Sequence, residues 1–271
     1  MSGARSAMRS SENSGIWSVL SKCVGDFFMI SIQPAMLFAL LALPASAQEG
    51  FETDVIKTSC GNLAITFIGH GSLMLKFDDK NIHIDPFSKL ADYSRLPKAD
   101  LLLITHEHQD HLDLAAIELI RTKDTKVVLT EKCAEKLSGG LVMKNGDSKT
   151  VAGIAIEAVP AYNLLHKREN GQPFHPKGQG NGYVLTCADK RIYIAGDTEN
   201  TLEMKALKNI DIAFLPMNLP YTMSFEMVAE AAQAFKPKRL YPYHFGDTET
   251  SRIVALLKDN KEIEVRIRKM Q

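Results

Sequence analysis

Short runs of apolar residues, separated by turn residues, fill the chain from residue 62 onward. Alternating or continuous apolar patterns predict strands at Asn62–Ile68, Ser72–Phe77, Asn81–Asp85, Asp100–Thr105, Lys126–Leu129, Thr150–Pro160, Tyr183–Cys187, Arg191–Ala195, Asp211–Leu215, Arg239–Tyr243 and Ile263–Ile267. The run at 100–105 is apolar almost throughout, which is typical of a strand covered on both faces.

Apolar residues with helical spacing occur in other segments. Helices are expected at Leu112–Thr122, Glu131–Leu137, Ser224–Phe235 and Ser251–Lys258. Strand meanders are followed by alternating strands and helices, and this order occurs twice without a linker between the halves. The pattern predicts one α+β domain in which two β-sheets pack together with helices outside.

The first residues do not fit this domain. Met29–Leu43 carries no charged residue and is followed by Ala45-Ser46-Ala47, a small-x-small site of the kind that signal peptidase cleaves. An apolar core of about 15 residues is short for a bilayer span. We therefore expect a signal peptide at 1–47, a mature domain at 48–271 without a stable membrane span, and a secreted or periplasmic location. The alternative is an uncleaved membrane anchor at the N-terminus.

Composition narrows the class of protein only a little. The chain has 271 residues, with 32 Lys+Arg against 32 Asp+Glu and therefore no net charge. A neutral balance argues against nucleic acid as a partner, since nucleic-acid binding favours a large basic excess. Removal of 1–47 leaves Cys60, Cys133 and Cys187 without a C-x-x-C motif, so neither a disulfide scaffold nor a cysteine-rich zinc site is expected.

The segment most suggestive of chemistry is Thr105–His111, which reads THEHQDH directly after a buried strand and before a helix. The spacing of His106 and His108 places both rings on one side of an extended segment, and Asp110 and His111 follow as the chain bends. One histidine here would suggest a solvated loop or a helix cap. Three histidines and an aspartate together favour a metal site, because zinc, iron and manganese share these ligand types.

In this arrangement the sequence resembles the metallo-β-lactamase fold superfamily. The motif His106-x-His108-x-Asp110-His111 is followed in order by Asp197 in IYIAGDT and His244 in LYPYHFGD, and Asp85 in IHIDPF precedes it. The resemblance covers about residues 62 to 247 and implies an αββα sandwich. The pieces GHGS, PAYN, HPKG, NGYVL, AGDTE and PYTM are similar to a branch of metal-dependent hydrolases that is closer to sugar-lactone hydrolases than to antibiotic-destroying lactamases.

The resemblance also implies ligands for two divalent metal ions, with zinc as the expected metal and manganese or iron as alternatives. His106 and His108 would hold one ion with a third histidine. Asp110, His111 and His244 would hold the second, and Asp197 would bridge the two. A hydroxide formed on the metals would attack the substrate, and Asp110 would also act as the catalytic residue that manages protons.

The third histidine is ambiguous, because the usual position in the family pattern reads Pro160-Ala161-Tyr162-Asn163 here. Residues 161–182 are polar and rich in Gly, Pro and Asn, which predicts a long functional loop. Two histidines lie in this loop. We favour His175, whose flanking prolines stiffen the backbone, over His166, which lies among charged residues.

Other residues are candidates for contact with the substrate. These are His70, Tyr162, Asn163 and Tyr221, with simple packing as the alternative for His70 and the two tyrosines. Asp85 is expected to orient a metal-bound histidine rather than to bind metal. His83 alternates with Ile82 and Ile84, which favours a surface position.

These observations favour a metal-dependent hydrolase that acts on a small-molecule substrate, namely an ester, lactone, amide or phosphodiester. A di-iron oxidoreductase on the same fold is an alternative, although Glu107 lies between the ligands of the motif and no redox domain follows. A β-lactam hydrolase is a further alternative. A non-catalytic binding protein is disfavoured because nearly all ligands are present.

Overall fold

The computed structural model describes residues 50–270 of the chain. The expected signal peptide at 1–47 lies outside the described residues and stays a prediction. Within the described part, no helix is both long enough and apolar enough to cross a bilayer. The described residues belong to one compact unit.

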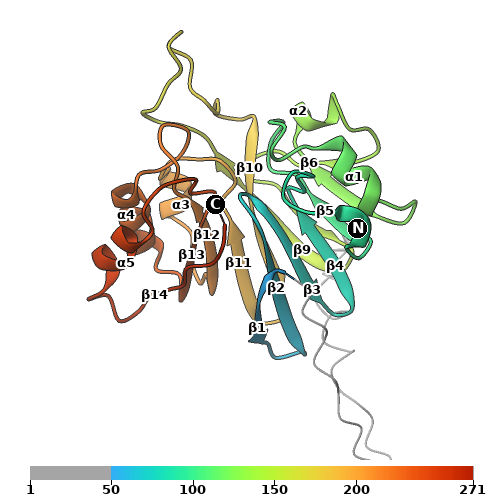
Figure 1. The fold of residues 1–271 in the computed structure, drawn as a ribbon, viewed down its shortest axis with the longest axis horizontal. Helices are drawn as coiled ribbons and strands as arrows, with labels where there is room; N and C mark the ends of the chain where they lie inside the picture. Colours follow the sequence, from blue (N-terminus) through green and yellow to red (C-terminus); the bar gives the residue numbers. More distant parts are fainter. Residues whose placement is uncertain (1–49, 271) are drawn as a thin grey trace, which may run out of the picture. The chain divides into compact units, whose positions relative to one another are not determined.

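Within residues 50–270, the first sheet has seven strands whose order in space follows their order along the chain. They are β1 (Glu52–Lys57), β2 (Asn62–Gly69), β3 (Ser72–Phe77), β4 (Lys80–Ile84), β5 (Leu101–Leu103), β6 (Lys126–Leu129) and β7 (Leu141–Val142). Strands β1 to β4 form an antiparallel meander, and β4 to β7 run parallel (Figure 1). The meander brings the β2–β3 turn to the same edge as the ends of β4 and β5.

The second sheet of the described chain repeats this scheme in seven further strands. They are β8 (Ser148–Val151), β9 (Ile154–Ala161), β10 (Gly180–Cys187), β11 (Lys190–Ile194), β12 (Ile212–Pro216), β13 (Arg239–Tyr243) and β14 (Glu264–Val265). Strands β8 to β11 are antiparallel, and β11 to β14 are parallel. The carboxyl ends of β11 and β13 consequently point to one edge of the sheet.

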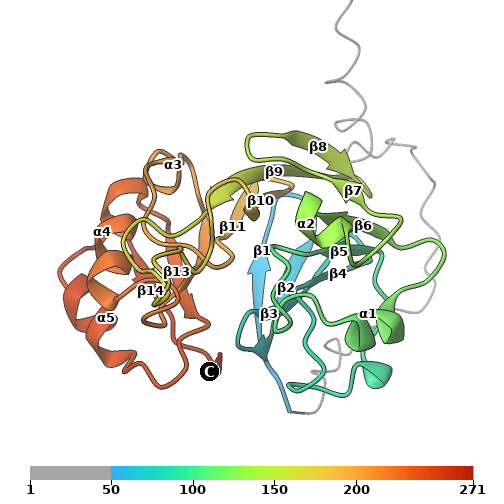
Figure 2. The same cartoon turned by 90° about the horizontal axis from the view of Figure 1, so that it is seen from above.

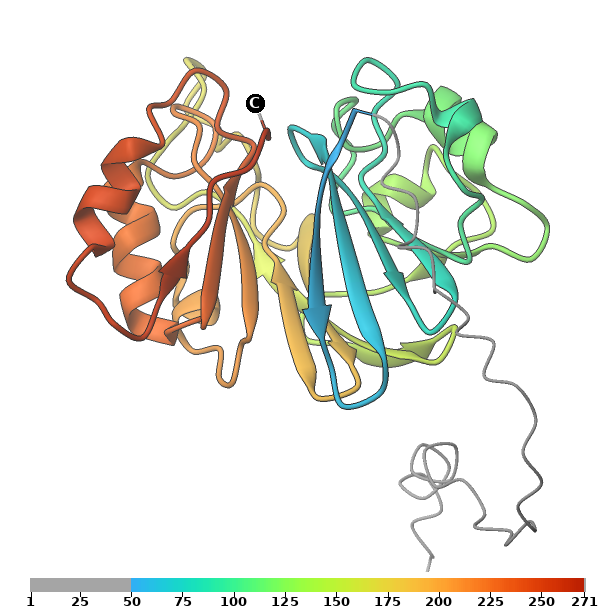
Figure 3. The same cartoon turned by 60° about the horizontal axis from the view of Figure 1, so that its bottom comes forward.

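Helices cover the outer faces of the two sheets. They are α1 (Leu114–Ile120), α2 (Glu131–Ala134), α3 (Leu202–Lys205), α4 (Phe225–Phe235) and α5 (Ser251–Leu257), with a short 3₁₀ helix at Tyr93–Arg95. In Figures 2 and 3, α4 and α5 lie on one flank and α1 on the other, with the sheets between them. The predicted αββα sandwich is confirmed.

The inner faces of the sheets meet in an apolar core. Phe67 of β2 lies 5.2 Å from Tyr241 of β13 and 6.2 Å from Phe214 of β12, measured between ring centroids. All three side chains are buried. Complete burial of a phenylalanine side chain contributes roughly 2–3 kcal/mol, so these rings help to fix one sheet against the other and hold their loop edges in place.

Several boundaries differ from the sequence-based expectations. Helix α1 begins at Leu114 because the Asp113 carboxylate caps it, accepting from the backbone amides of residues 115 and 116. The strand expected at Thr150–Pro160 is a hairpin of β8 and β9, whose turn at Ala152-Gly153 has positive φ at both residues. Strands β1 and β7 and helix α3 were not expected from the sequence, and β7 and α3 are too short to show a periodic pattern.

The expectation for His83 was wrong. Its side chain is buried, and its Nε2 lies 3.0 Å from the carbonyl oxygen of Pro97. Burial lowers the pKa of His83 to about 4. Alternation along β4 placed this side chain on the outer face of the sheet, but the segment that carries Tyr93 covers that face, with 6.3 Å between the two ring centroids.

Candidate metal centre

Polar side chains gather where strands of both sheets end. The THEHQDH segment follows β5, Asp197 follows β11, and His244 follows β13. His70 lies in the β2–β3 turn, and its carbonyl oxygen accepts a hydrogen bond from the His244 amide at 3.0 Å. Strands that are distant in sequence therefore deliver their terminal side chains to one place.

Three histidines form the first group of ligand candidates. The distance from His108 Nδ1 is 3.1 Å to His106 Nε2 and 3.2 Å to His175 Nε2. These three nitrogens lie close enough together to hold one metal ion. The structure thus brings His175, and not His166, to this group.

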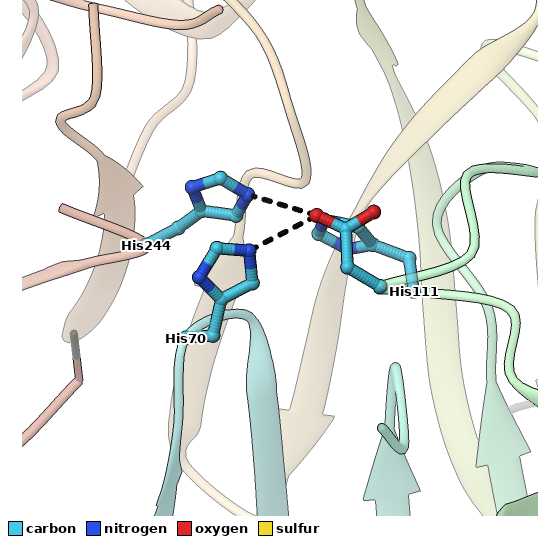
Figure 4. Close-up of side chains that lie close together, drawn as sticks. His70, His111 and His244 are labelled. Carbon is cyan, nitrogen blue, oxygen red and sulfur yellow. Dashed lines mark hydrogen bonds and ion pairs between the residues drawn. The ribbon is translucent and has the colours of Figure 1, made fainter. Parts of the chain in front are cut away.

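The second group contains Asp110 and three histidines. Asp110 Oδ2 lies 3.0 Å from His70 Nε2, 3.7 Å from His244 Nε2 and 3.8 Å from His111 Nε2. Figure 4 shows His70 and His244 directed at the same carboxylate oxygen, beside His111. These atoms could also hold one ion. His70 therefore lies among the ligand candidates.

Asp197 lies between the two groups. Its Oδ2 is 3.3 Å from His175 Nε2 and 3.4 Å from His244 Nε2, while its Oδ1 is 3.4 Å from His111 Nε2. Gly196 before it has φ +65°, and a Cβ there would lie 3.0 Å from the Thr105 Cβ and from the Asn181 carbonyl oxygen. A glycine is required at that turn to present the carboxylate so deeply.

The donor atoms of this cluster fit a cation. His111 Nε2, His244 Nε2 and Asp197 Oδ1 are buried and have no hydrogen-bond partner among the described residues. Buried polar atoms are nearly always paired, and unpaired nitrogens and oxygens that face a common point are what a metal site requires. Imidazole and carboxylate together are the ligand set of zinc, iron and manganese.

Asp85 fixes one member of the second group from behind. Its Oδ2 lies 2.8 Å from His111 Nδ1, and its two oxygens accept from the amide and the hydroxyl of Thr105 at 2.8 and 2.6 Å. A hydrogen bond at Nδ1 leaves Nε2 of His111 directed toward the metal position. This geometry matches the orienting role expected for Asp85.

Asn163 fixes one member of the first group, His175, in the same way. Its Oδ1 accepts from the His175 amide at 2.7 Å and lies 2.9 Å from His175 Nδ1. Its Nδ2 donates to Glu199 and to the Tyr221 carbonyl oxygen. Both ends of this amide are used inside the protein, which is typical of a positioning residue, and the expected contact of Asn163 with the substrate stays a prediction.

Sequence reasoning missed Glu199, which organises the start of the long loop. Its fully buried carboxylate accepts from the backbone amides of residues 164, 165 and 166 at 2.7–2.8 Å and from Asn163 Nδ2 at 3.1 Å, and it lies 2.7 Å from His166 Nδ1. His166 is therefore part of the loop anchor. An acidic residue two positions after Asp197 was the signal that could have indicated this role.

A cavity of about 390 Å³ opens over both groups. Its lining combines Asp110, Asp197 and histidines of both groups, His70 included, with Arg168, Phe174, Asn218 and Tyr221. Two of the expected substrate contacts, His70 and Tyr221, thus face the cavity. Tyr162 does not: its hydroxyl donates to Glu203 at 3.0 Å and accepts from Lys177 at 3.2 Å.

The two groups differ in their electrostatics in the absence of metal. Burial, together with neighbouring histidines, lowers the pKa of His106 and of His108. Burial acts in the same direction on His111, but Asp197 and Asp85 outweigh it and raise the pKa of His111 to about 9. Burial favours the neutral form of Asp110, yet His244 and His70 hold the pKa of this carboxyl well below its usual range.

Comparison with known proteins places the chain in a family. Residues 64–244 match the model of the β-lactamase superfamily domain. A UPF0173 metal-dependent hydrolase of Methanopyrus kandleri is 31% identical over 195 residues, which cover 68% of this chain and 84% of that protein.

Solved structures extend the similarity to three dimensions. A protein of Parabacteroides distasonis assigned as a metal-dependent hydrolase is 52% identical, with a TM-score of 0.78 over 82% of this chain and all of that one. The metallo hydrolase Igni18 of Ignicoccus hospitalis shares the fold at 24% identity, with a TM-score of 0.64 over 77% of this chain and 96% of its own. The chain belongs to the metallo-β-lactamase superfamily and is a metal-dependent hydrolase.

Proposed function

We propose that this hydrolase uses two divalent ions, with zinc as the native metal, to cleave a small ester, lactone, amide or phosphodiester. The observation that carries the proposal is the position of Asp197, whose carboxylate contacts ligand atoms of both groups. A carboxylate offers two oxygens and can serve two cations at once. A site for one ion would leave one group of buried histidines without a role.

The proposed ligands fall into two sets, one for each ion. His106, His108 and His175 would hold one ion, Asp110, His111 and His244 would hold the other, and Asp197 would contact both. Bound there, a pair of divalent ions supplies Lewis acidity and lowers the pKa of a coordinated water toward neutrality.

Asp110 is suited to move a proton between this site and the cavity. Its side chain is 36% exposed, against 4% for Asp197, so it reaches both the ligand cluster and the space where a substrate would lie. The His70 ring, 3.0 Å from its Oδ2, steadies that oxygen. The lowered pKa of Asp110 makes it a weak base, so its part is to guide a proton by hydrogen bonding from the attacking water toward the leaving group.

Titration of the metal-free protein with zinc, followed by calorimetry and by metal analysis after dialysis, tests this proposal. We expect two bound ions per chain and hydrolysis of at least one class in a panel of lactones, aryl esters, amides and phosphodiesters. Removal of metal by a chelator should abolish that activity, and zinc should restore it.

A matched pair of variants controls for unfolding. His108→Ala removes a proposed ligand, and Lys167→Ala removes an exposed side chain from the long loop. The first should lower the stoichiometry toward one ion and the second should leave it at two. Binding of a single ion by the unaltered protein, or inactivity across the whole panel with both sites filled, would overturn the proposal.

A further inference from the structure

Arg168 lines the cavity above the metal centre and has no acidic partner. Its guanidinium lies 5.1 Å from the centre of the Phe174 ring and donates to the Phe174 carbonyl oxygen at 3.3 Å. Within the described chain, no carboxylate lies at ion-pair distance from it. By contrast, Lys177 of the same loop is paired with Glu203 at 2.9 Å.

The loop holds Arg168 in a defined position. Its amide donates to the Gln172 carbonyl oxygen at 2.8 Å, the Gly171 amide donates back to the Arg168 carbonyl at 2.9 Å, and Lys167 pairs with Pro173 as in a strand. These bonds close a tight hairpin at 167–173. The Phe174 ring beneath the guanidinium is itself braced by Tyr221, with 5.1 Å between ring centroids.

The charged residues that line the cavity suggest what Arg168 binds. The acidic residues that line the cavity are Asp110 and Asp197, and both belong to the proposed metal centre. Arg168 is the lining residue with a permanent positive charge. An arginine presents a planar fork of donors that matches the paired oxygens of a carboxylate or a phosphate.

We propose that Arg168 binds an anionic group of the substrate, a carboxylate or a phosphate, that lies away from the bond to be cleaved. Arg168 lines the same cavity as five of the proposed metal ligands, so one substrate can contact both. This inference rests on the proposed hydrolase function and names the class of substrate: a hydrolysable compound with an anionic tail.

Matched p-nitrophenyl esters test the inference with the zinc-loaded protein. One acyl chain ends in a free carboxylate, one in a phosphate, and one in a neutral methyl ester of the same length. We expect a higher kcat/KM for an anionic ester than for the neutral one. A hydrogen bond to a charged group contributes about 1.5–3 kcal/mol, so Arg168→Gln should reduce this anionic-to-neutral ratio roughly tenfold to a hundredfold, through KM.

Lys167→Gln is the matched control, because it removes the same charge from the neighbouring position of the same hairpin. It should leave the ratio unchanged. Equal ratios in the two variants would overturn the role of Arg168. The arm with the larger arginine-dependent ratio identifies the group as carboxylate or phosphate.

A binding measurement separates failure of this inference from failure of the hydrolase proposal. If none of the esters is cleaved, the proposed hydrolytic activity loses support, but calorimetry with glutarate and with inorganic phosphate still tests the anion site. At least one of these probes should bind Arg168→Gln about tenfold more weakly than it binds Lys167→Gln. Equal affinities for both probes would overturn the inference.

Discussion

The two groups of ligand candidates differ in the origin of their side chains. Asp110, His111 and His244 follow strands β5 and β13 of the packed sheets, and Asp85 fixes His111 from behind. The first group also draws on β5, but its third member, His175, comes from the long loop between β9 and β10. One group is therefore built by strand ends, and the other depends on the fold of a loop.

This difference shows how hydrogen bonds from neighbouring residues can hold a loop residue in place. The buried Glu199 carboxylate accepts hydrogen bonds from residues 163 to 166 and so fixes Asn163. Asn163 in turn fixes the position of His175 through two contacts below 3 Å. Asp85 does for His111 in one step what Glu199 and Asn163 do for His175 in two. We expect the longer chain of contacts to be the more fragile one.

The largest effect should come from removing the carboxylate that both groups share. Asp197→Ala should weaken both metal sites and reduce activity by more than about a hundredfold, since loss of a partner outside the ligand set already costs about tenfold to a hundredfold. Zinc titration and steady-state kinetics measure this. The exposed Asp124→Ala is the control and should match the unaltered protein. Loss of one site with full retention of the other would contradict a shared ligand.

A selective effect should follow from releasing the loop anchor. Glu199→Gln should weaken zinc binding at the first site by about tenfold to a hundredfold and leave the second site close to unchanged, because only His175 loses its support. Cobalt spectra recorded during a two-step titration distinguish the sites. Glu203→Gln, a nearby partly exposed residue, should change neither site. An equal loss at both sites would mean that Glu199 supports the whole fold rather than His175.

The metal affinities of the two groups should also differ in their dependence on pH. Burial lowers the pKa of His106 and His108, so these rings are neutral at pH 7 and metal binding there releases no proton from them. The pKa of His111 is raised to about 9, so below that pH a metal must displace its proton. Affinity of the second site should rise about tenfold per pH unit from 7 to 9, then level off.

Zinc titrations at a series of pH values in weakly chelating buffer measure this slope. The first site should show a much flatter dependence over the same range. Identical slopes at the two sites would contradict the difference in electrostatics.

The smallest effect should come from weakening the support of His111. Asp85→Asn removes one of the three carboxylates that raise the pKa of His111, the others being Asp197 and Asp110, so the plateau in second-site affinity should move to lower pH. At pH 9 the variant should bind zinc at that site about tenfold more weakly than the unaltered protein, because His111 is less well oriented. An unchanged plateau would show that Asp197 and Asp110 suffice to raise the pKa of His111 without Asp85.

Sequence patterns predicted the sheets and the ligand candidates that lie close together in the sequence after β5. The alternation of β2 and β3, the apolar run of β5 and the density of histidines after it are local features, and each reflects a requirement of the fold or of a metal. Patterns within one segment cannot show which residues from other segments cover it. For that reason the burial of His83 and the carboxylate of Glu199 were missed, and the internal role of Asn163 became visible only when residues 163, 175 and 199 were brought together.

The hairpin at 167–173 is attached at both ends to fixed points, with Glu199 and Asn163 before it and His175 after it. We therefore expect substitutions between those points to leave the metal ligands in place. Substitutions can then change the tip of the hairpin, Arg168 included, while the proposed metal ligands stay the same. Proteins that keep every histidine of this centre can therefore differ in substrate specificity while they share one metal centre. The tip of the hairpin is where we expect such differences to be tolerated best.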